Sequence, residues 1–456
     1  MRHRLAFALS SLALWGSQAI LASAQSPIIV NDSPPMLVSN TATELLAPIS
    51  PKTSPGPMSL DACIELGFQH QPALDAARAS LAAAHSGKRG VDRLPVPAFI
   101  LKDLRVRREQ ACHGVAIAEA GLSAAEWDTR YSITRNFFTV QYIRAQQKVV
   151  NDVLNNLDVG LGRAQKIFDA GDPGAKITQL DLDAIRVQIG FVRGKRGQVE
   201  NGMLKALAAL REAIGVNHDY PLEIAAVDLP PAVYEVKTTV DMKEKIDYRP
   251  LYKFDKTELI AAAIANRGEM MQANSASRVT ELEVRAQSLT RGLQSKTFAW
   301  SADIHAKPIP QGIFNNEYRP GAIGLEMPPF LGGRKADRVE RASALNQRAS
   351  AVVDKTQNLV SLDVEAQFLK WQEAVENIQN LREIYDTAQK LPDQVLKLMQ
   401  GKDLTGAAII QSNMVAIQVR TQLNDEMHIH ALALAGLERA TAGAFRVYPI
   451  PAASPK

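Results

Sequence analysis

Residues 150–169, VNDVLNNLDVGLGRAQKIFD, decide the fold class of this 456-residue chain. Apolar residues occur in this stretch at alternating steps of four and three positions, and they are Val150, Leu154, Leu157, Leu161, Ala164 and Phe168. Such heptad spacing is typical of helices that pack against one another in a coiled coil. The same spacing returns later in the chain at Val364, Phe368, Trp371, Val375 and Ile378.

A long interval without proline surrounds the first of these stretches. No proline occurs between Pro97 and Pro173, and the sequence is helical in pattern over about residues 104–169. At about 1.5 Å per residue, a helix of that span is roughly 100 Å long. A compact domain cannot contain it. We therefore expect a mainly α-helical protein built from long coiled-coil hairpins, although the chain length alone suggests two or three domains.

The helical part of the chain occurs twice. Similar residues align at a shift of 196 positions in the first part of the repeat and at a shift of 230 in the second. Aligned pairs include Ile64 and Ile260, Leu74 and Met270, Arg108 and Arg338, Phe138 and Phe368, and Gly171 and Gly401. We interpret them as two tandem repeats at 59–215 and 257–441, joined by a linker at 216–256 and followed by a tail at 442–456. Chance similarity of two alanine-rich helical stretches is the alternative.

The larger shift in the second part of the repeat implies an insertion at 297–333 in the second copy. Apolar and polar residues alternate there, with Phe298, Trp300 and Ile304 on one side and Asp303 and His305 on the other. A membrane-crossing strand needs about 9–11 residues with this alternation. A soluble, half-buried β-hairpin has the same pattern, so the residues leave both interpretations open. In the first, Phe298, Trp300 and Ile304 face lipid.

The N-terminal residues have the pattern of a secretory signal peptide. Arg2 and Arg4 precede an apolar stretch, and Ala22-Ser23-Ala24 provides a small-residue cleavage site, so we expect residues 1–24 to be removed. An uncleaved anchor is the alternative. Residues 25–58 hold seven prolines and three charges, which indicates an extended linker. No later stretch of 18 apolar residues predicts a transmembrane helix, so the exported chain is expected to be periplasmic, secreted or inserted as a β-barrel.

The composition excludes several classes of protein. The net charge of +4, from 52 basic and 48 acidic residues, is too small to indicate nucleic acid as a partner. Two cysteines, Cys63 and Cys112, cannot form a disulfide scaffold or a cysteine-rich zinc site, and we expect both to be small buried residues. His428 and His430 point about 200° apart on a helix and cannot chelate one ion. We find no nucleophile elbow, phosphate loop or zinc-protease motif. No enzyme activity, cofactor or metal is therefore expected.

Taken in order, these features resemble the TolC-like outer-membrane efflux channel family. Four features carry the resemblance. Three are stretches of sequence, namely Ser59–Ala77 with the sequence SLDACIELGFQHQPALDAA, its second copy around Asn266-Arg267-Gly268-Glu269-Met270, and Leu325–Arg334 with the sequence LEMPPFLGGR. The last of these stretches is similar to the turn at which a strand of the family enters a helix, and contains Pro328, Pro329, Phe330, Gly332 and Gly333. The fourth feature is the pair of glycine turns at Gly171 and Gly401, which look like the family's hairpin tips. The resemblance covers about residues 59–441.

The resemblance implies a homotrimer whose helices form an α-barrel in the periplasm and whose strands share one β-barrel in the outer membrane of a Gram-negative-type bacterium. It implies a passive exit duct for small molecules or ions, with a periplasmic adaptor and an inner-membrane pump as partners. Gly171 and Gly401 would then lie at the hairpin tips where the adaptor docks. A non-conducting periplasmic coiled-coil scaffold with a vestigial β-hairpin is the rival interpretation.

Two departures from the family pattern stand out. Family members carry a strand pair in each repeat, but the stretch Arg93–Pro97 leads almost directly into the next helix. Two strands per protomer would give six in a trimer, which is too few for a wide pore. Some family members carry a ring of aspartates just after the second tip, and it is also missing here, because residues 410–414 contain no carboxylate. Asp181 and Asp183 of the first repeat could supply an acidic constriction instead, or could serve only to complement a helix start.

Overall fold

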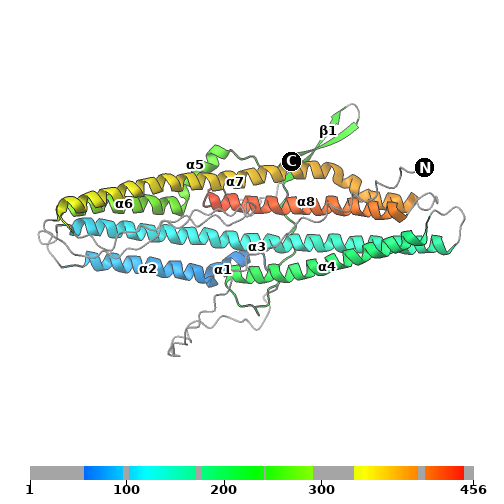
Figure 1. The fold of residues 1–456 in the computed structure, drawn as a ribbon, viewed down its shortest axis with the longest axis horizontal. Helices are drawn as coiled ribbons and strands as arrows, with labels where there is room; N and C mark the ends of the chain where they lie inside the picture. The colour runs from blue at the N-terminus through cyan, green and yellow to red at the C-terminus, as the bar shows by residue number, and fades with distance from the viewer. Residues whose placement is uncertain are drawn as a thin grey trace, which may run out of the picture. The chain divides into compact units, whose positions relative to one another are not determined.

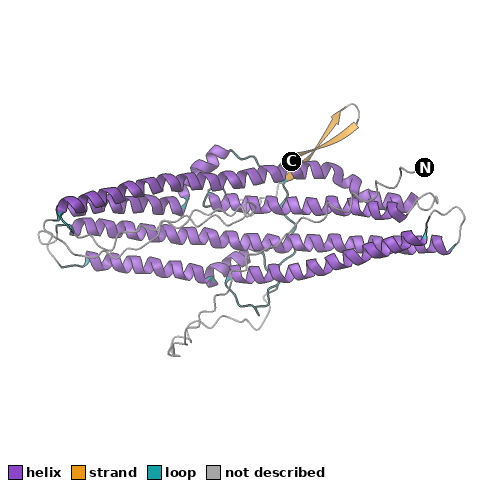
Figure 2. Ribbon diagram, viewed as in Figure 1, coloured by secondary structure: helices purple, strands orange, loops and turns teal. Residues whose placement is uncertain are grey.

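The computed structural model describes residues 56–95, 102–170, 177–240, 243–290, 333–398 and 406–445. All of them belong to one compact unit, Ile49–Lys456. Most of these residues are helical (Figure 2). The elements are α1 (Leu60–His70), α2 (Pro72–Asp92), α3 (Leu104–Asp169), α4 (Gln179–Ile214), β1 (Val233–Val240), β2 (Lys243–Pro250), α5 (Lys256–Asn266), α6 (Gly268–Leu289), α7 (Lys335–Leu398) and α8 (Gly406–Ala440).

The same succession of four helices occurs twice in the described part of the chain. Helices α1 to α4 have 11, 21, 66 and 36 residues, and α5 to α8 have 11, 22, 64 and 35. Helix α5 begins 196 residues after α1, and α6 begins 196 residues after α2, which is the shift read from the sequence. The predicted tandem arrangement of helical hairpins is therefore present in the fold.

The heptad stripes lie where helices meet. In α3, Leu154, Leu157 and Ala164 are buried, while Phe168 near the end of the helix keeps 38% of its surface exposed. In α7, Val364, Trp371 and Val375 are buried in a core shared with α5 and α8. Apolar residues at this spacing stabilise a pair of helices along their whole length because each turn contributes one buried side chain.

The helices lie in a row that is four helices wide (Figure 1). Helix α3 packs against α2 and α4 on one side and against α6 and α8 on the other, and α7 packs against α6 and α8. The short helices α2 and α4 thus share one column, and α6 and α8 share another. One edge of the row is formed by α2 along part of its length and by α4 along the rest, and α7 forms the other edge.

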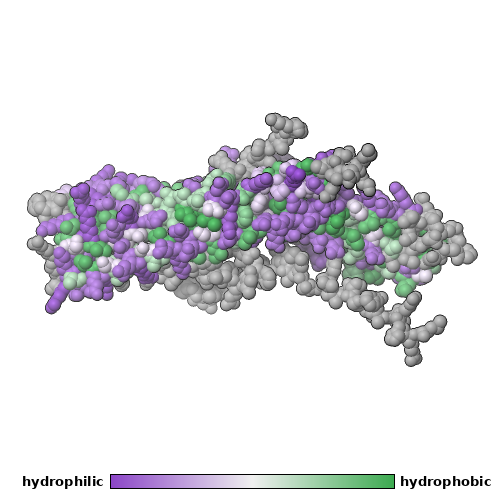
Figure 3. All heavy atoms as spheres, turned by 90° about the horizontal axis from the view of Figure 1, so that it is seen from above, coloured by the Kyte–Doolittle hydropathy of each residue, from purple (hydrophilic) through white to green (hydrophobic). Residues whose placement is uncertain are grey.

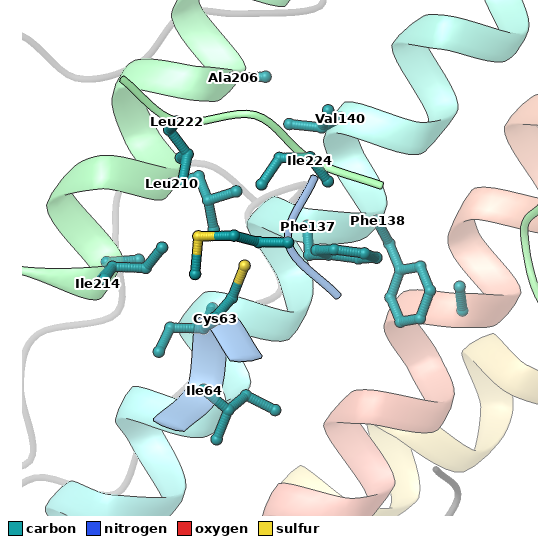
Figure 4. Close-up of a cluster of buried hydrophobic side chains, with 14 of the residues drawn as sticks. Cys63, Ile64, Phe137, Phe138, Val140, Ala206, Leu210, Ile214, Leu222 and Ile224 are labelled. Atoms are coloured by element: carbon teal, nitrogen blue, oxygen red, sulfur yellow. The ribbon is translucent and has the colours of Figure 1, made fainter. Parts of the chain in front are cut away.

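The core of the first repeat lies where α1 meets α3 and α4. Cys63 and Ile64 of α1 face Phe137 of α3 and Leu210 of α4, with Ile224 from the following linker closing the cluster (Figure 4). Burial raises the pKa of the Cys63 thiol to about 12, so this side chain behaves as a small hydrophobic group. Cys112 is exposed on α3, so the expectation that both cysteines are buried is wrong for Cys112. The two thiols are free.

Two glycines mark close approaches between elements. Gly215 ends α4 with a left-handed backbone (φ +82°), and a Cβ at this position would lie 2.5 Å from the carbonyl oxygen of His70. Gly268 begins α6, and a Cβ there would lie 2.3 Å from the carbonyl oxygen of Ala120 in α3. Each glycine therefore lets a helix end touch the backbone of a neighbouring element.

The predicted linker at 216–256 contains a β-hairpin that the sequence analysis did not predict. Strands β1 and β2 are antiparallel, with Val233 opposite Pro250 and Val236 opposite Asp247. The Nε2 of Gln379 in α7 donates to the Tyr248 carbonyl oxygen at 2.7 Å and ties the hairpin to the row. Earlier in the same linker, Ile224 forms a parallel bridge with Met58 in the core of the first repeat. A two-stranded hairpin is marginally stable alone, so the bond from Gln379 helps to hold β1 and β2.

Several predicted features lie outside the described residues. They are the signal peptide at 1–24, nearly all of the linker at 25–58, the tips Gly171 and Gly401, the lipid-facing residues Phe298, Trp300 and Ile304, and the turn residues Pro328, Pro329, Phe330 and Gly332. Of the turn motif, Gly333 is described. None of the helices within the described ranges holds an apolar stretch able to cross a membrane.

Candidate functional site

The two edges of the helical row expose apolar side chains. On α4, Leu180, Val187 and Phe191 are 79%, 59% and 69% exposed, and they recur at seven- and four-residue steps along one face. On α7, Leu362 and Leu369 are 50% and 53% exposed, again seven residues apart. Seen from above, on the side of the row formed by α7, hydrophobic residues lie among hydrophilic ones (Figure 3). Both edges therefore have the pattern of helix faces that pack against further helices.

Asp181 is engaged in starting α4. Its Oδ2 accepts hydrogen bonds from the backbone N–H of Thr178 at 2.9 Å and from the Thr178 hydroxyl at 2.7 Å, and its own N–H donates to Thr178 Oγ1 at 3.3 Å. This reciprocal arrangement is a capping box. The carboxylate thus complements the helix terminus, which was one of the two roles considered for it from the sequence.

Asp183 is on the exposed surface of the same helix. It accepts a hydrogen bond from Gln179 Nε2 at 3.2 Å and forms an ion pair with Arg186 at 2.8 Å. Residues two apart on a helix point in nearly opposite directions. Asp181 and Asp183 therefore cannot line the same surface, and an acidic constriction formed by this helix would use Asp183. The constriction stays a prediction because it requires several copies of the chain.

The two hairpin ends pack together next to the predicted tips. Ile409, near the start of α8, is fully buried in one core with Leu157, Leu182 and Ile185 of the first repeat. A Cβ on Gly160 of α3 would lie 3.1 Å from Ile409 Cγ2, so the absence of a side chain at this position allows the close contact. The described ends of the α3–α4 and α7–α8 hairpins consequently pack side by side.

At the opposite end of the row, a buried arginine connects α6 to α7. Arg338 is 1% exposed, and its Nε donates to Gln287 Oε1 at 3.0 Å. Its guanidinium also donates to the carbonyl oxygens of Gly333 at 2.9 Å and Thr290 at 3.2 Å. Arg108 aligns with it in the first repeat and donates to the Asp92 carbonyl oxygen at 3.1 Å. The sequence repeat pointed to this pair of arginines, but not to their role in fastening helix ends.

A cluster of buried ionic groups lies where α5 and α6 meet α7 and α8. Asp363 accepts hydrogen bonds from Arg267 Nη1 at 2.7 Å and from Arg439 Nη2 at 2.9 Å, and both arginines are less than 10% exposed. Glu269 pairs with Arg267 at 2.7 Å. Burial acts to raise the pKa of Glu269, but the hydrogen bond and charge of Arg267 outweigh it and lower that pKa. The cluster links the second repeat to Asp128 of α3.

A second polar cluster joins α3 to α8. The Tyr142 hydroxyl donates to Asp425 Oδ1 at 2.6 Å, and Gln146 Nε2 donates to the same oxygen at 2.9 Å. The His428 ring stacks on Tyr142 with 4.6 Å between centroids. Burial lowers the pKa of His428 and of His430 to about 4, so both imidazoles are neutral at pH 7. The contacts of Tyr142 and Gln146 with Asp425 and His428 hold the two repeats together within one chain.

No protein-family model matches the sequence, and no curated protein matches it. The structure is nevertheless similar to several solved structures. The outer membrane protein VceC from Vibrio cholerae aligns with 85% of this chain and 97% of its own length, at a TM-score of 0.63 and 16% identity. The outer-membrane channel OprN aligns with 84% of this chain and 90% of its own length, at a TM-score of 0.65 and 12% identity. The open state of the MtrE outer membrane channel from Neisseria gonorrhoeae aligns with 84% of this chain and 89% of its own length, at a TM-score of 0.55 and 13% identity.

These alignments establish the fold. They extend over nearly the whole of each solved chain, at identities too low to show more than shared architecture. The chain therefore has the mainly α-helical fold of the TolC-like outer-membrane channels, which the sequence motifs predicted. Of the solved structures named above, OprN and MtrE are described as outer-membrane channels.

Proposed function

We propose that this chain is a protomer of a homotrimeric outer-membrane efflux channel, a passive exit duct of a tripartite export system for small molecules or ions. Its helices form the periplasmic part of the duct after the signal peptide is removed. The hairpin ends near Gly171 and Gly401 dock a periplasmic adaptor, and an inner-membrane pump supplies the energy. The fold shared with outer-membrane channels supports this proposal.

The observation that carries the proposal is the pair of open edges. A row of helices with exposed apolar residues on both α4 and α7 leaves those residues in water unless further helices cover them. The α4 edge of one copy can pack on the α7 edge of the next, because the two edges are different surfaces that face in opposite directions along the row. Repetition of such a contact closes a ring. Three copies of a row four helices wide give a closed wall around a central passage.

Two measurements test the proposal. The purified full-length chain in mild detergent is expected to have about three times the protomer mass by light scattering, and to produce discrete single-channel currents in a planar lipid bilayer. A denatured sample at the same detergent concentration is the control for leakage caused by detergent. A stable trimer without currents would contradict the channel and support a scaffold. A stable monomer would contradict both the trimer and the closed wall.

The scaffold alternative is favoured by one feature of the chain. Residues 93–103 between α2 and α3 number 11, whereas residues 290–334 between α6 and α7 number 45. Eleven residues cannot supply two membrane strands of about 9–11 residues each and a turn. Only the second repeat therefore has length for a strand pair. Alkaline carbonate separates the alternatives independently of currents, because it releases a peripheral scaffold from outer-membrane fractions and leaves an integral channel in place.

A further inference from the structure

One end of the helical row is strongly basic. It comprises the end of α2, the start of α3, the end of α6 and the start of α7, which lie together in Figure 1. This end contains twelve lysines and arginines but only seven aspartates and glutamates, counted over residues 85–95, 102–110, 281–290 and 333–341. The excess of five positive charges at this end exceeds the net charge of +4 of the whole chain.

The hairpin end of the row provides an internal comparison. Windows of similar length there, residues 161–170, 177–186, 390–398 and 406–414, hold five basic and four acidic residues. The two ends share the long helices α3 and α7, and they differ in charge by four units. Positive charge is therefore concentrated at one end, and is not a general property of the surface.

Much of the acidic charge at the basic end is already paired. Asp92 forms an ion pair with Lys88 at 2.6 Å, and Arg107 pairs with both Asp103 and Glu283. Seven cations remain exposed at this end, and their side chains form no ion pair with a described residue. They are Arg89, Arg93, Lys102, Arg105, Arg285, Arg334 and Lys335.

The helix ends that carry these cations are fixed relative to one another. Gln110 of α3 donates to the Val279 carbonyl oxygen of α6 at 3.0 Å, and Arg338 of α7 donates to Gln287 of α6. The backbone at the end of α2 is held by Arg108 of α3. The cations therefore belong to one rigid surface. A preformed surface loses less conformational entropy on binding than separate flexible segments do.

We propose that this surface, which we call the basic collar, rests on the anionic phospholipid headgroups of the membrane that the second repeat enters. The inference depends on the proposed function, because the chain between α6 and α7, which contains the predicted lipid-facing strand, leaves and re-enters the row at this end. The 11-residue connection between α2 and α3 is too short to cross the membrane. The first repeat therefore ends at the headgroup level, where Arg89, Arg93, Lys102 and Arg105 meet phosphate.

The strength of this contact depends on ionic strength. A lysine or arginine near an anionic membrane surface strengthens binding about fivefold. The interaction is screened over about 10 Å in 0.1 M salt and over about 3 Å in 1 M salt. A collar of several cations per protomer, present in three copies, should therefore produce a marked and salt-sensitive preference for anionic lipid.

A flotation experiment with the full-length chain tests the inference. The protein is diluted from detergent onto vesicles of phosphatidylcholine alone, or of an equal mixture of phosphatidylcholine and phosphatidylglycerol. The parent chain is expected to bind the anionic vesicles at least about tenfold more tightly in low salt, with the preference lost in 1 M salt. A variant with Arg89, Arg93, Lys102 and Arg105 each changed to glutamine is expected to lose most of that preference.

A matched control variant has the same net charge as the collar variant, but its four substitutions lie away from the collar. It replaces Arg163, Lys166, Lys195 and Lys205, four exposed cations of α3 and α4 outside the collar, with glutamine. This control is expected to retain the preference for anionic vesicles. Circular dichroism of both variants checks that the helices remain. Equal binding of the parent chain to both vesicle types, or equal loss in both variants, would overturn the inference.

The test is separable from that of the proposed function. Loss of lipid preference in the collar variant with unchanged single-channel currents supports both the channel and the collar. A parent chain that passes no current but prefers anionic vesicles contradicts the channel and retains the collar as a membrane-contact surface. A parent chain that passes current without any lipid preference retains the channel and overturns the collar.

Discussion

Replacing Asp363 with asparagine should destabilise the protein more than any exposed charge change. Asp363 lies in α7 with 2% of its side chain exposed, and its carboxylate receives hydrogen bonds from Arg267 at 2.7 Å and from Arg439 at 2.9 Å. Asparagine has nearly the same shape but carries no charge. Both guanidinium groups would then remain buried with less compensation, in a region where water cannot replace the missing carboxylate.

The expected loss follows from the partners that remain. Breaking a buried ion pair by removing one member costs about 3–5 kcal/mol. Arg267 keeps Glu269 at 2.7 Å, and Arg439 keeps Asp128 at 3.3 Å. Because each arginine retains a second carboxylate, the free energy of unfolding should fall by about 3 kcal/mol, at the lower end of that range. At about 2.1 cal/mol/K of unfolding entropy per residue, this loss corresponds to a decrease in Tm of about 3 °C for a chain of this size.

Thermal unfolding followed by far-UV circular dichroism, at a fixed scan rate in mild detergent, measures the effect. Asp128→Asn is the matched control, because it removes the same charge from the same network at a side chain that is 44% exposed. This exposed change should cost less than about 1 kcal/mol. Equal decreases in Tm for the two variants would show that burial does not set the energy of this cluster, and the reasoning would be wrong.

Three further predictions concern the edges, the buried histidines and the inserted hairpin. Phe191→Glu on the open α4 edge should reduce the trimer to smaller species by light scattering, whereas Val159→Glu, an exposed apolar residue of the central helix α3, should leave the mass unchanged. Burial lowers the pKa of His430 to about 4, so below about pH 6.5 the unfolded chain binds a proton that the folded chain does not. The free energy of unfolding should therefore be highest above pH 6.5 and fall as the pH decreases towards 4. His430→Leu removes this group and should flatten the dependence of Tm on pH. Ile304→Arg should sharply reduce recovery of the protein in outer-membrane fractions, because a charge facing lipid costs about 2–4 kcal/mol near the midplane. His305→Arg, on the other side of the strand, should be tolerated. Equal recovery of both variants would mean that the alternation does not report lipid contact.

Sequence periodicity was sufficient to predict the helices. The helix expected over about 104–169 is α3, Leu104–Asp169, and the repeat shift of 196 separates α1 from α5 and α2 from α6. Helix formation depends on hydrogen bonds between residues four apart and on side chains three and four apart, which are all local in the sequence. A repeated sequence therefore produces a repeated succession of helices.

The hairpin at 233–250 was missed although a signal for it exists. Residues 233–240, VYEVKTTV, are rich in β-branched and aromatic side chains, which favour strands. Its position next to α7, where Gln379 binds the Tyr248 carbonyl oxygen, depends on a contact across 131 residues that no local pattern records. Likewise, the exposure of Cys112 could not be read from an alanine-rich context, because an apolar neighbourhood in sequence does not fix which face of a helix is covered.

The amino-acid sequence alone established long heptad-patterned helices, their tandem repetition and the resemblance to outer-membrane channels, because these follow from local spacing and short motifs. Only the tertiary structure revealed that Asp363 joins Arg267 and Arg439, that α4 and α7 form the open edges, and that the basic residues of four helix ends share one surface. These properties depend on which segments, far apart in the chain, lie side by side. Burial and electrostatic energy act through space, and the packing of the row decides which charges are paired in the interior and which remain in water.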